Sequence, residues 1–227
     1  MVSRETKDIA IAWIALSVAF ALAFSNLNLI GVISGNFLQA VPLFIVMFPV
    51  SLFVVGTAFV FHELGHRNVA RHFNFVAEFR KWNQGLMIAL GFAFLIGAIF
   101  AAPGAVYIGG KKKKNWDEQS KWDSEYPEYA SSNDESNELG LISVAGVVIN
   151  IILGFVFLGL LLFLPSFGAF DFILKMVFSL GYTINFILAG FNLLPFGPLD
   201  GKKVMQWNPI IWGILFLPIA AWYFFFL

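Results

Sequence analysis

The short sequence His62-Glu63-Leu64-Gly65-His66 places two imidazoles and a carboxylate near the end of an apolar segment. In a helix, positions i and i+4 share one face, so His62 and His66 can both bind one metal ion. Glu63 follows the first histidine, within reach of a water on that ion, from which its carboxylate can take a proton. Imidazole ligands suit zinc, although nickel and cobalt accept the same groups. The spacing therefore predicts a metal site with hydrolytic chemistry.

The alternative is that these residues are ordinary polar groups on a solvated helix end. In a membrane helix, however, each ionisable group is costly unless it is paired or functional. The chain has 3 histidines, and two of them occupy this spacing. The third, His72, follows Arg71 in a basic segment and is interpreted as an interfacial side chain. A metal site is therefore the preferred interpretation.

A catalytic zinc site usually has three protein ligands and one open position, so a third ligand is needed. Asp171 precedes Lys175 by one helical turn, and the two are expected to form an interfacial ion pair. Asp200 lies in the segment 192–201, where prolines and glycines break a helix as it leaves the bilayer. Broken backbone at membrane depth normally lines a cavity or a site, and an acid there is costly unless functional. Asp200 is therefore the predicted third ligand.

The composition indicates which elements position these residues. Hydrophobic residues make up 59% of the 227 residues, and charged residues make up only 12%, against about 25% in a soluble domain. Several apolar segments reach the roughly 20 residues that span a bilayer. The fold class predicted is an all-α polytopic membrane protein with five to six transmembrane helices, forming one membrane-embedded domain over residues 1–227. The helices are expected at about residues 9–30, 41–69, 139–164, 171–195 and 208–226.

Charge and cysteine usage exclude several classes. The chain contains no cysteine, which excludes disulfides, cysteine zinc sites and a thiol nucleophile. The net charge of zero gives no argument for nucleic acid as a partner.

The distribution of basic residues predicts the orientation of the protein in the membrane. Basic residues lie at the amino-terminus, near Arg67 and Arg71, and near Lys202, and these segments are expected in the cytoplasm. The strongly polar segment 111–138 is predicted to be a solvated cytoplasmic loop. We thus expect a multi-pass protein of the cell membrane whose active site faces the cytoplasm.

Three motifs in this chain resemble those of the site-2 protease family of intramembrane zinc metalloproteases. They are His62-Glu63-Leu64-Gly65-His66, then Asn192-x-x-Pro195-x-x-x-x-Asp200-Gly201, and a weaker Ala145-Gly146-x-x-x-Asn150. The segment Ala102-Pro103-Gly104-Ala105-Val106 also resembles a short membrane-associated strand of that family. The resemblance covers roughly residues 40–205. Val147 and Lys202 depart from the family pattern without removing a catalytic group.

The resemblance implies a zinc-dependent endopeptidase that hydrolyses transmembrane substrate helices. By position, His62, His66 and Asp200 would hold one Zn²⁺ ion, and Glu63 would be the catalytic base. Asn192 would donate a hydrogen bond to the developing oxyanion, as an amide can where water is scarce; bonding the broken backbone near Pro195 is the structural alternative. For Asn150 there are likewise two possible roles, helix packing and support of the site. The expected partners are single-span transmembrane proteins and the lipid bilayer.

The apolar segment 85–102 tests the metal hypothesis. If it crossed the membrane fully, Asp200 would lie on the opposite face from His66, about 30 Å away, whereas ligands lie about 2 Å from zinc. Residues 103–110 are rich in strand formers and glycine, and in extended form they reach roughly 26 Å. We therefore predict a re-entrant unit with a short membrane-associated β-strand, which returns Lys111–Lys114 to the cytoplasm. An edge strand near Val106 could also hold an unwound substrate by strand addition.

Other functions fit the sequence less well. A serine protease would need a histidine apart from the metal pair, and an aspartyl protease would need two membrane aspartates. A metal transporter is the main alternative from another class, yet the remaining helices have few charges to form a polar path. An inactive relative that binds membrane proteins is the third possibility, and the presence of every catalytic group argues against it.

Overall fold

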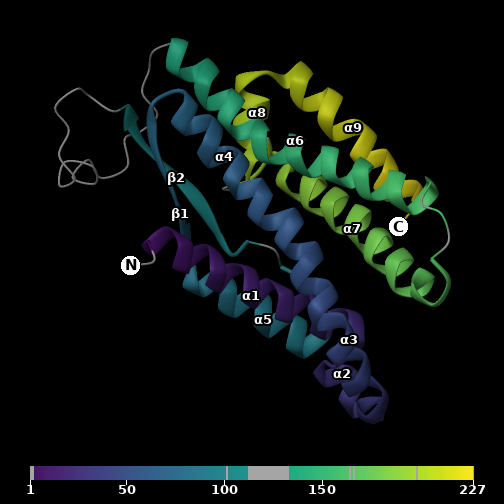
Figure 1. The fold of residues 1–227 in the computed structure, drawn as a ribbon. Coiled ribbons are helices and arrows are strands. Elements are labelled where there is room, and N and C mark those ends of the chain that lie inside the picture. The colour runs from purple at the N-terminus through teal and green to yellow at the C-terminus, as the bar shows by residue number, and fades with distance from the viewer. Residues whose placement is uncertain are drawn as a thin grey trace. The chain divides into compact units, whose positions relative to one another are not determined.

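The structure is a computed structural model that describes residues 3–226 except 101, 112–132, 164, 166 and 198. It is mostly helical, with a small two-stranded sheet (Figure 1). The predicted return of Lys112–Lys114 to the cytoplasm falls outside the described residues. The chain forms two compact units, one of residues 1–60 and 79–105 and the other of residues 61–78 and 106–227.

The first unit contains α1 (Arg4–Ser25), α2 (Leu29–Ile33), α3 (Phe37–Val55), the π-helix η1 (Gly56–Val60) and α5 (Asn83–Ile96). Helix α1 packs against α3 and α5. The indole of Trp13 donates to the carbonyl of Leu52 at 2.8 Å, and a Cβ at Gly56 would lie only 2.9 Å from that indole nitrogen. Glycine at the start of η1 therefore leaves the space that the indole occupies.

The sequence predicts one uninterrupted helix over 9–30 and another over 41–69. The structure instead ends α1 at Ser25, because Asn26 adopts a left-handed conformation with φ 55°. It also places η1 directly before the metal-binding sequence, and α4 (Phe61–His72) follows. A π-helical turn shifts the register of the side chains that follow it and is common near functional sites. Apolar periodicity alone carries no signal for either feature.

The chain that follows β1 (Phe75–Lys81) forms a helix and then comes back to the end of that strand. The N–H of Trp82 donates to the carbonyl of Pro103 at 2.8 Å, so the end of β1 lies beside the start of β2 (Gly104–Lys111). The two strands are therefore antiparallel. Helix α5, with 14 residues, is about 21 Å long, short of the roughly 30 Å of a bilayer core. The sequence predicts a return along residues 103–110. In the structure the chain is already beside Trp82 at Pro103, before β2 begins, and β2 pairs with β1, a strand that the sequence did not predict.

Four helical runs among the described residues are long and apolar enough to cross a membrane, which supports a multi-pass membrane protein. They are Arg4–Ile33, Phe37–His72, Asn137–Phe163 and Gly168–Asn192. Helix α5 and the last helix, α9 (Pro209–Phe226), are shorter. The predicted polytopic helical fold is thus supported, while the number of five to six membrane crossings stays a prediction.

The second unit is built around α6 (Asn133–Phe163), which packs against α4, α7 (Asp171–Asn192) and α8 (Asp200–Trp207). The 3₁₀ turn η2 (Gly168–Phe170) leads into α7. Small residues bring these helices close: a Cβ at Gly65 of α4 would lie 2.5 Å from the Ile149 side chain of α6. Likewise, a Cβ at Gly181 of α7 would meet Phe157 at 2.5 Å. Close approach through glycine is the usual way for helices to associate in a membrane.

A buried apolar cluster joins α4, α6 and the sheet within this unit. Ala70 of α4, Phe75 and Ala77 of β1, and Ile142 of α6 form its centre. Two side chains of β2, from Val106 and Ile108, pack against that centre. Strand β2, helix α6 and the helix that carries His62 and His66 are therefore held by one set of contacts.

Candidate metal centre

The two histidines of α4 meet as their spacing predicts. Both are buried, each with 5% of its surface exposed. The Nε2 atoms of His62 and His66 lie 3.0 Å apart, and the two rings are nearly perpendicular. One turn of helix thus directs both imidazoles to a single point.

Each imidazole is oriented through its other nitrogen by α6. The Nδ1 of His66 lies 2.7 Å from the carbonyl oxygen of Ile142, which can only accept, so this nitrogen carries a hydrogen and donates it. The Nδ1 of His62 lies 3.0 Å from Oδ1 of Asn150 and donates in the same way. In the neutral ring, Nε2 then presents a lone pair. Both histidines are therefore arranged as metal ligands.

Glycine lets α6 approach the histidines this closely. A Cβ built on Gly146 would overlap Nε2 of His66 and lie 2.7 Å from Cε1 of His62. Any larger residue at this position would displace at least one imidazole. Gly146 and Asn150 are one turn apart, so the same stripe of α6 provides both the space and the hydrogen-bond acceptor.

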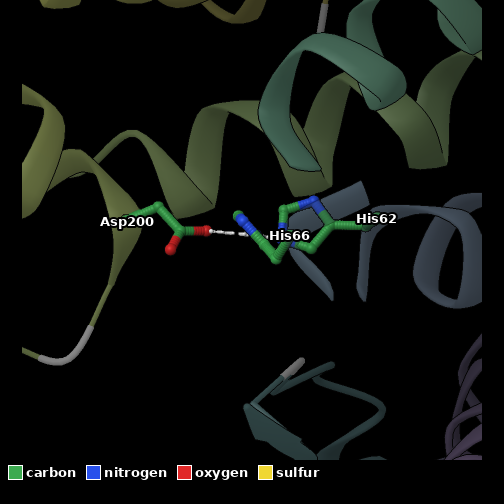
Figure 2. A group of neighbouring side chains, drawn as sticks. All are labelled: His62, His66 and Asp200. Carbon is green, nitrogen blue, oxygen red and sulfur yellow. Dashed lines mark hydrogen bonds and ion pairs between the residues drawn. The ribbon is translucent and has the colours of Figure 1, made fainter. Parts of the chain in front are cut away.

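The carboxylate of Asp200 completes the group. Its Oδ2 lies 3.0 Å from Nε2 of His66 and 3.4 Å from Nε2 of His62. Figure 2 shows the carboxylate pointing toward the ring of His66, with His62 beside it. Asp200 is the first residue of α8, where a negative charge is stabilised by the helix dipole. A carboxylate 134 residues after the second histidine, as their numbers give, is therefore brought to the same point.

The end of α7 fixes where α8 begins. A Cβ on Gly201 would overlap the backbone of Leu193, so glycine is required for this close contact. The same Leu193 carbonyl accepts a hydrogen bond from the indole of Trp212 at 2.7 Å. Leu193 is fully buried in a cluster with Val147 and Ala189. The helix break predicted from the prolines and glycines is thus stabilised by three sets of contacts at Leu193: with Gly201, with Trp212 and with the buried cluster.

The charge state of Asp200 suits a metal ligand. Burial raises the pKa of its carboxyl, but when a proton is held at this centre the charge of the protonated His66 and hydrogen bonds with both histidines outweigh burial. They hold the pKa of Asp200 well below its usual range. Because the folded-state pKa is depressed, the carboxylate stays ionised at neutral pH and would be protonated only under strongly acidic conditions.

The three ligand atoms fit a zinc ion. They all lie within 4.8 Å of one another. Ligands at 2.0–2.1 Å from a tetrahedral ion would be about 3.3 Å apart, and the distances that the structure gives are 3.0, 3.0 and 3.4 Å. Two nitrogen lone pairs and a carboxylate oxygen converge at this point, so a cation is needed between them, either a proton or a metal ion. The donor set of two imidazoles and one carboxylate is a usual catalytic zinc set.

Glu63 is buried beside this group, with 8% of its surface exposed. The charges of His62, Asp200 and Lys203 act on its carboxylate. Lys203 is one turn after Asp200 in α8. The helix that supplies the histidines therefore also brings a buried carboxylate to the centre.

The remaining predicted residues take other positions. Asn192, at the end of α7, donates from Nδ2 to the carbonyl of Leu188 at 3.0 Å, a bond within its own helix. Asp171, the first residue of α7, accepts from the N–H of Phe167, which directly precedes the turn η2. His72 ends α4 and packs edge-on against Phe73. Sequence analysis missed Ile142 and Trp212, since a backbone acceptor and an indole on a distant helix have no recognisable spacing.

Comparisons with known proteins agree with this site. The family model described as "Peptidase family M50" matches residues 50–174. A protein of Methanocaldococcus jannaschii named "Putative zinc metalloprotease MJ0611" is 38% identical over 219 residues, which cover 96% of this chain and 92% of that protein. One of Bacillus subtilis named "Putative zinc metalloprotease YwhC" is 39% identical over 71 residues, 29% of this chain and 32% of that protein. No solved structure gives a significant match. The resemblance to site-2 proteases is confirmed, and the chain belongs to peptidase family M50 as a zinc metalloendopeptidase.

Proposed function

We propose that this enzyme hydrolyses peptide bonds of single-span transmembrane substrates, at a zinc site near the cytoplasmic face of the cell membrane. In this proposal His62, His66 and Asp200 hold the metal and Glu63 is the general base. The observation that carries it is the convergence of two helices on one point: Nε2 of His66 and Oδ2 of Asp200 lie 3.0 Å apart at the end of an apolar run.

Zinc, when bound, would act as a Lewis acid that lowers the pKa of a water molecule to about 7 and polarises the substrate carbonyl. Glu63 accepts one proton from the attacking water, whose oxygen adds to the carbonyl carbon of the substrate. The carbon–nitrogen bond then breaks, and Glu63 returns the proton to the leaving amine. The buried position of Glu63 keeps this proton out of bulk solvent. One carboxylate thus serves as base and then as acid.

Asn192 can contribute to this reaction without leaving its present position. Its amide has two hydrogens, and the bond to Leu188 uses one of them. The other remains as a donor for the oxygen on which negative charge develops. In this proposal Asn192 is therefore an oxyanion donor as well as part of the α7 terminus.

Strand β2 is the proposed holder of the substrate. A helical substrate must unwind before hydrolysis, because its carbonyls are bonded within the helix. The described sheet has two strands, so β2 pairs with β1 on one side and leaves its other edge for a further strand. Val106 and Ile108 anchor β2 to the cluster around Ile142, whose carbonyl orients His66. A substrate strand on β2 would therefore be held close to the zinc ligands.

The proposed orientation follows from charge. Arg67 and Arg71 lie in α4 after the histidines, and Lys202 and Lys203 follow Asp200 in α8. Basic residues beside membrane helices favour the cytoplasm. Membership of a peptidase family argues against metal transport as the alternative function.

The test uses protein purified in detergent, with bound zinc measured by mass spectrometry and cleavage measured on a panel of single-span substrates. Glu63→Gln should retain zinc and lose cleavage, since an amide cannot accept the proton. His66→Ala should lose both. Cleavage that survives in Glu63→Gln would contradict the assigned base, and a wild-type enzyme that cuts only water-soluble peptides would contradict the substrate class. Bound zinc without cleavage of any substrate would favour an inactive relative.

A further inference from the structure

Asn150 of α6 is the most deeply buried polar neighbour of the metal centre. None of its surface is exposed. Its Oδ1 accepts from Nδ1 of His62 at 3.0 Å, which connects residues 88 positions apart in the chain. This side chain touches a ligand, and it lies on the opposite side of the imidazole from the nitrogen that faces Asp200.

The amide of Asn150 is satisfied at one end only. Its Nδ2 is enclosed and has no hydrogen-bond partner among the described residues. An enclosed N–H without an acceptor is unfavourable, so packing alone gives no reason for an asparagine here. The bond to His62 is the interaction that accounts for it.

A second buried asparagine shows what a purely local role looks like. Asn185 of α7 also has none of its surface exposed. Its Nδ2 donates to the carbonyl of Gly181 at 2.8 Å, within its own helix, and its Oδ1 has no partner among the described residues. Asn185 thus matches Asn150 in residue type, burial and partial hydrogen bonding, but its amide bonds within its own helix and not to a metal ligand.

We propose that Asn150 is a positioning residue that selects the tautomer of His62. By accepting from Nδ1, it keeps the hydrogen on that nitrogen and leaves the lone pair of Nε2 directed at the metal. Without this acceptor, the hydrogen can move to Nε2, and the ring is free to rotate. Gly146, one turn earlier, leaves the space in which the oriented ring fits. This inference rests on the proposed zinc site.

The expected effect is on metal affinity. Removing a partner of a metal-binding histidine typically weakens metal binding by about 10–100-fold. Asn150→Leu, which has a similar volume and no acceptor, should show a loss of this size. Asn150→Asp retains an oxygen acceptor and adds a charge that favours Nδ1–H, so it should bind zinc at least as tightly as the wild type. Asn185→Leu should bind zinc as the wild type does.

The test titrates the four metal-free proteins with zinc against a chromophoric chelator and records the visible spectrum of their cobalt forms. Asn150→Leu should weaken zinc binding and alter the cobalt bands, while Asn185→Leu and Asn150→Asp retain the wild-type spectrum. Equal affinities for Asn150→Leu and the wild type would overturn the inference, as would equal losses in both leucine variants. If Asn150→Leu does not fold, the result for Asn150→Asp is used instead, and weaker zinc binding by Asn150→Asp than by the wild type would overturn the inference. A wild type that binds no zinc would instead overturn the proposed function.

Discussion

His66 and Ile142 join the metal centre to the sheet. The Nδ1 of His66 donates to the Ile142 carbonyl at 2.7 Å, while the side chain of Ile142 packs in the cluster that includes Val106 of β2. One residue of α6 therefore orients a metal ligand with its backbone and supports the strand with its side chain. The geometry of the site and the geometry of the strand are therefore linked through Ile142, a residue whose side chain takes no part in the chemistry.

Proline at Val106 should separate substrate binding from metal binding. Proline has no N–H and so removes one backbone donor from β2. A backbone hydrogen bond contributes about 1 kcal/mol net, which corresponds to roughly a fivefold effect on binding. We expect Val106→Pro to lower kcat/KM for single-span substrates by at least this factor and to leave zinc content unchanged.

The matched control for this variant is Val106→Ala, which shortens the side chain but retains the N–H. If alanine and proline lower kcat/KM equally, loss of packing in the Ile142 cluster explains the result, and strand addition is wrong. If both variants cleave normally, β2 does not hold the substrate.

Gly146 should tolerate no side chain. An added methyl group would overlap Nε2 of His66 and press on the ring of His62. We expect Gly146→Ala to weaken zinc binding by about tenfold or more, in line with the cost of disturbing a ligand's surroundings. Gly159→Ala is the control, because it lies on the same helix with nothing within 4 Å of its added Cβ. Equal zinc affinity in the two variants would show that α6 does not constrain the histidines.

Much of this site is predictable because its signals are local. The spacing of His62 and His66 requires only that α4 be a helix. Asp200 is predictable because an acid at a break in a membrane segment has few other reasons to be there. The hydrogen-bond partners of the histidines are harder to predict from the sequence. Ile142 acts through its carbonyl, which every residue has, and Asn150 meets His62 only once α4 and α6 are packed together.

The fold shows the same division. Long apolar segments predict α6 and α7 to within a few residues at most ends, but they do not reveal β1 or the π-helix η1. Strand β1 follows α4 directly and pairs with β2, more than 20 residues later by their numbers. Its pairing depends on a partner that sequence periodicity cannot identify. The short helix α8 was likewise hidden by the prolines and glycines that precede it.

Trp212 should support Asp200 through the end of α7. Its indole donates to the Leu193 carbonyl, against which Gly201 also packs. Trp212→Phe retains an aromatic ring and removes the donor, which leaves a buried acceptor at a cost of about 1–3 kcal/mol. We expect a lower Tm and weaker zinc binding. Trp222→Phe is the control, since Trp222 lies on the same helix and packs against Tyr182 and Phe186; an equal loss of zinc affinity in both would contradict the proposed support.

The two halves of the zinc site must face the same side of the membrane, and the absence of cysteine from the chain makes this directly measurable. Three exposed positions of the second unit can each receive a single cysteine: His72 at the end of α4, Lys202 in α8, and Phe167 between α6 and α7. Two candidate spans, Asn137–Phe163 and Gly168–Asn192, separate His72 from Lys202. A membrane-impermeant thiol reagent should therefore modify His72→Cys and Lys202→Cys only from the cytoplasmic side, and Phe167→Cys only from the other. Modification of His72→Cys and Lys202→Cys from opposite sides would place Asp200 about 30 Å from the histidines, a separation that no single ion can bridge.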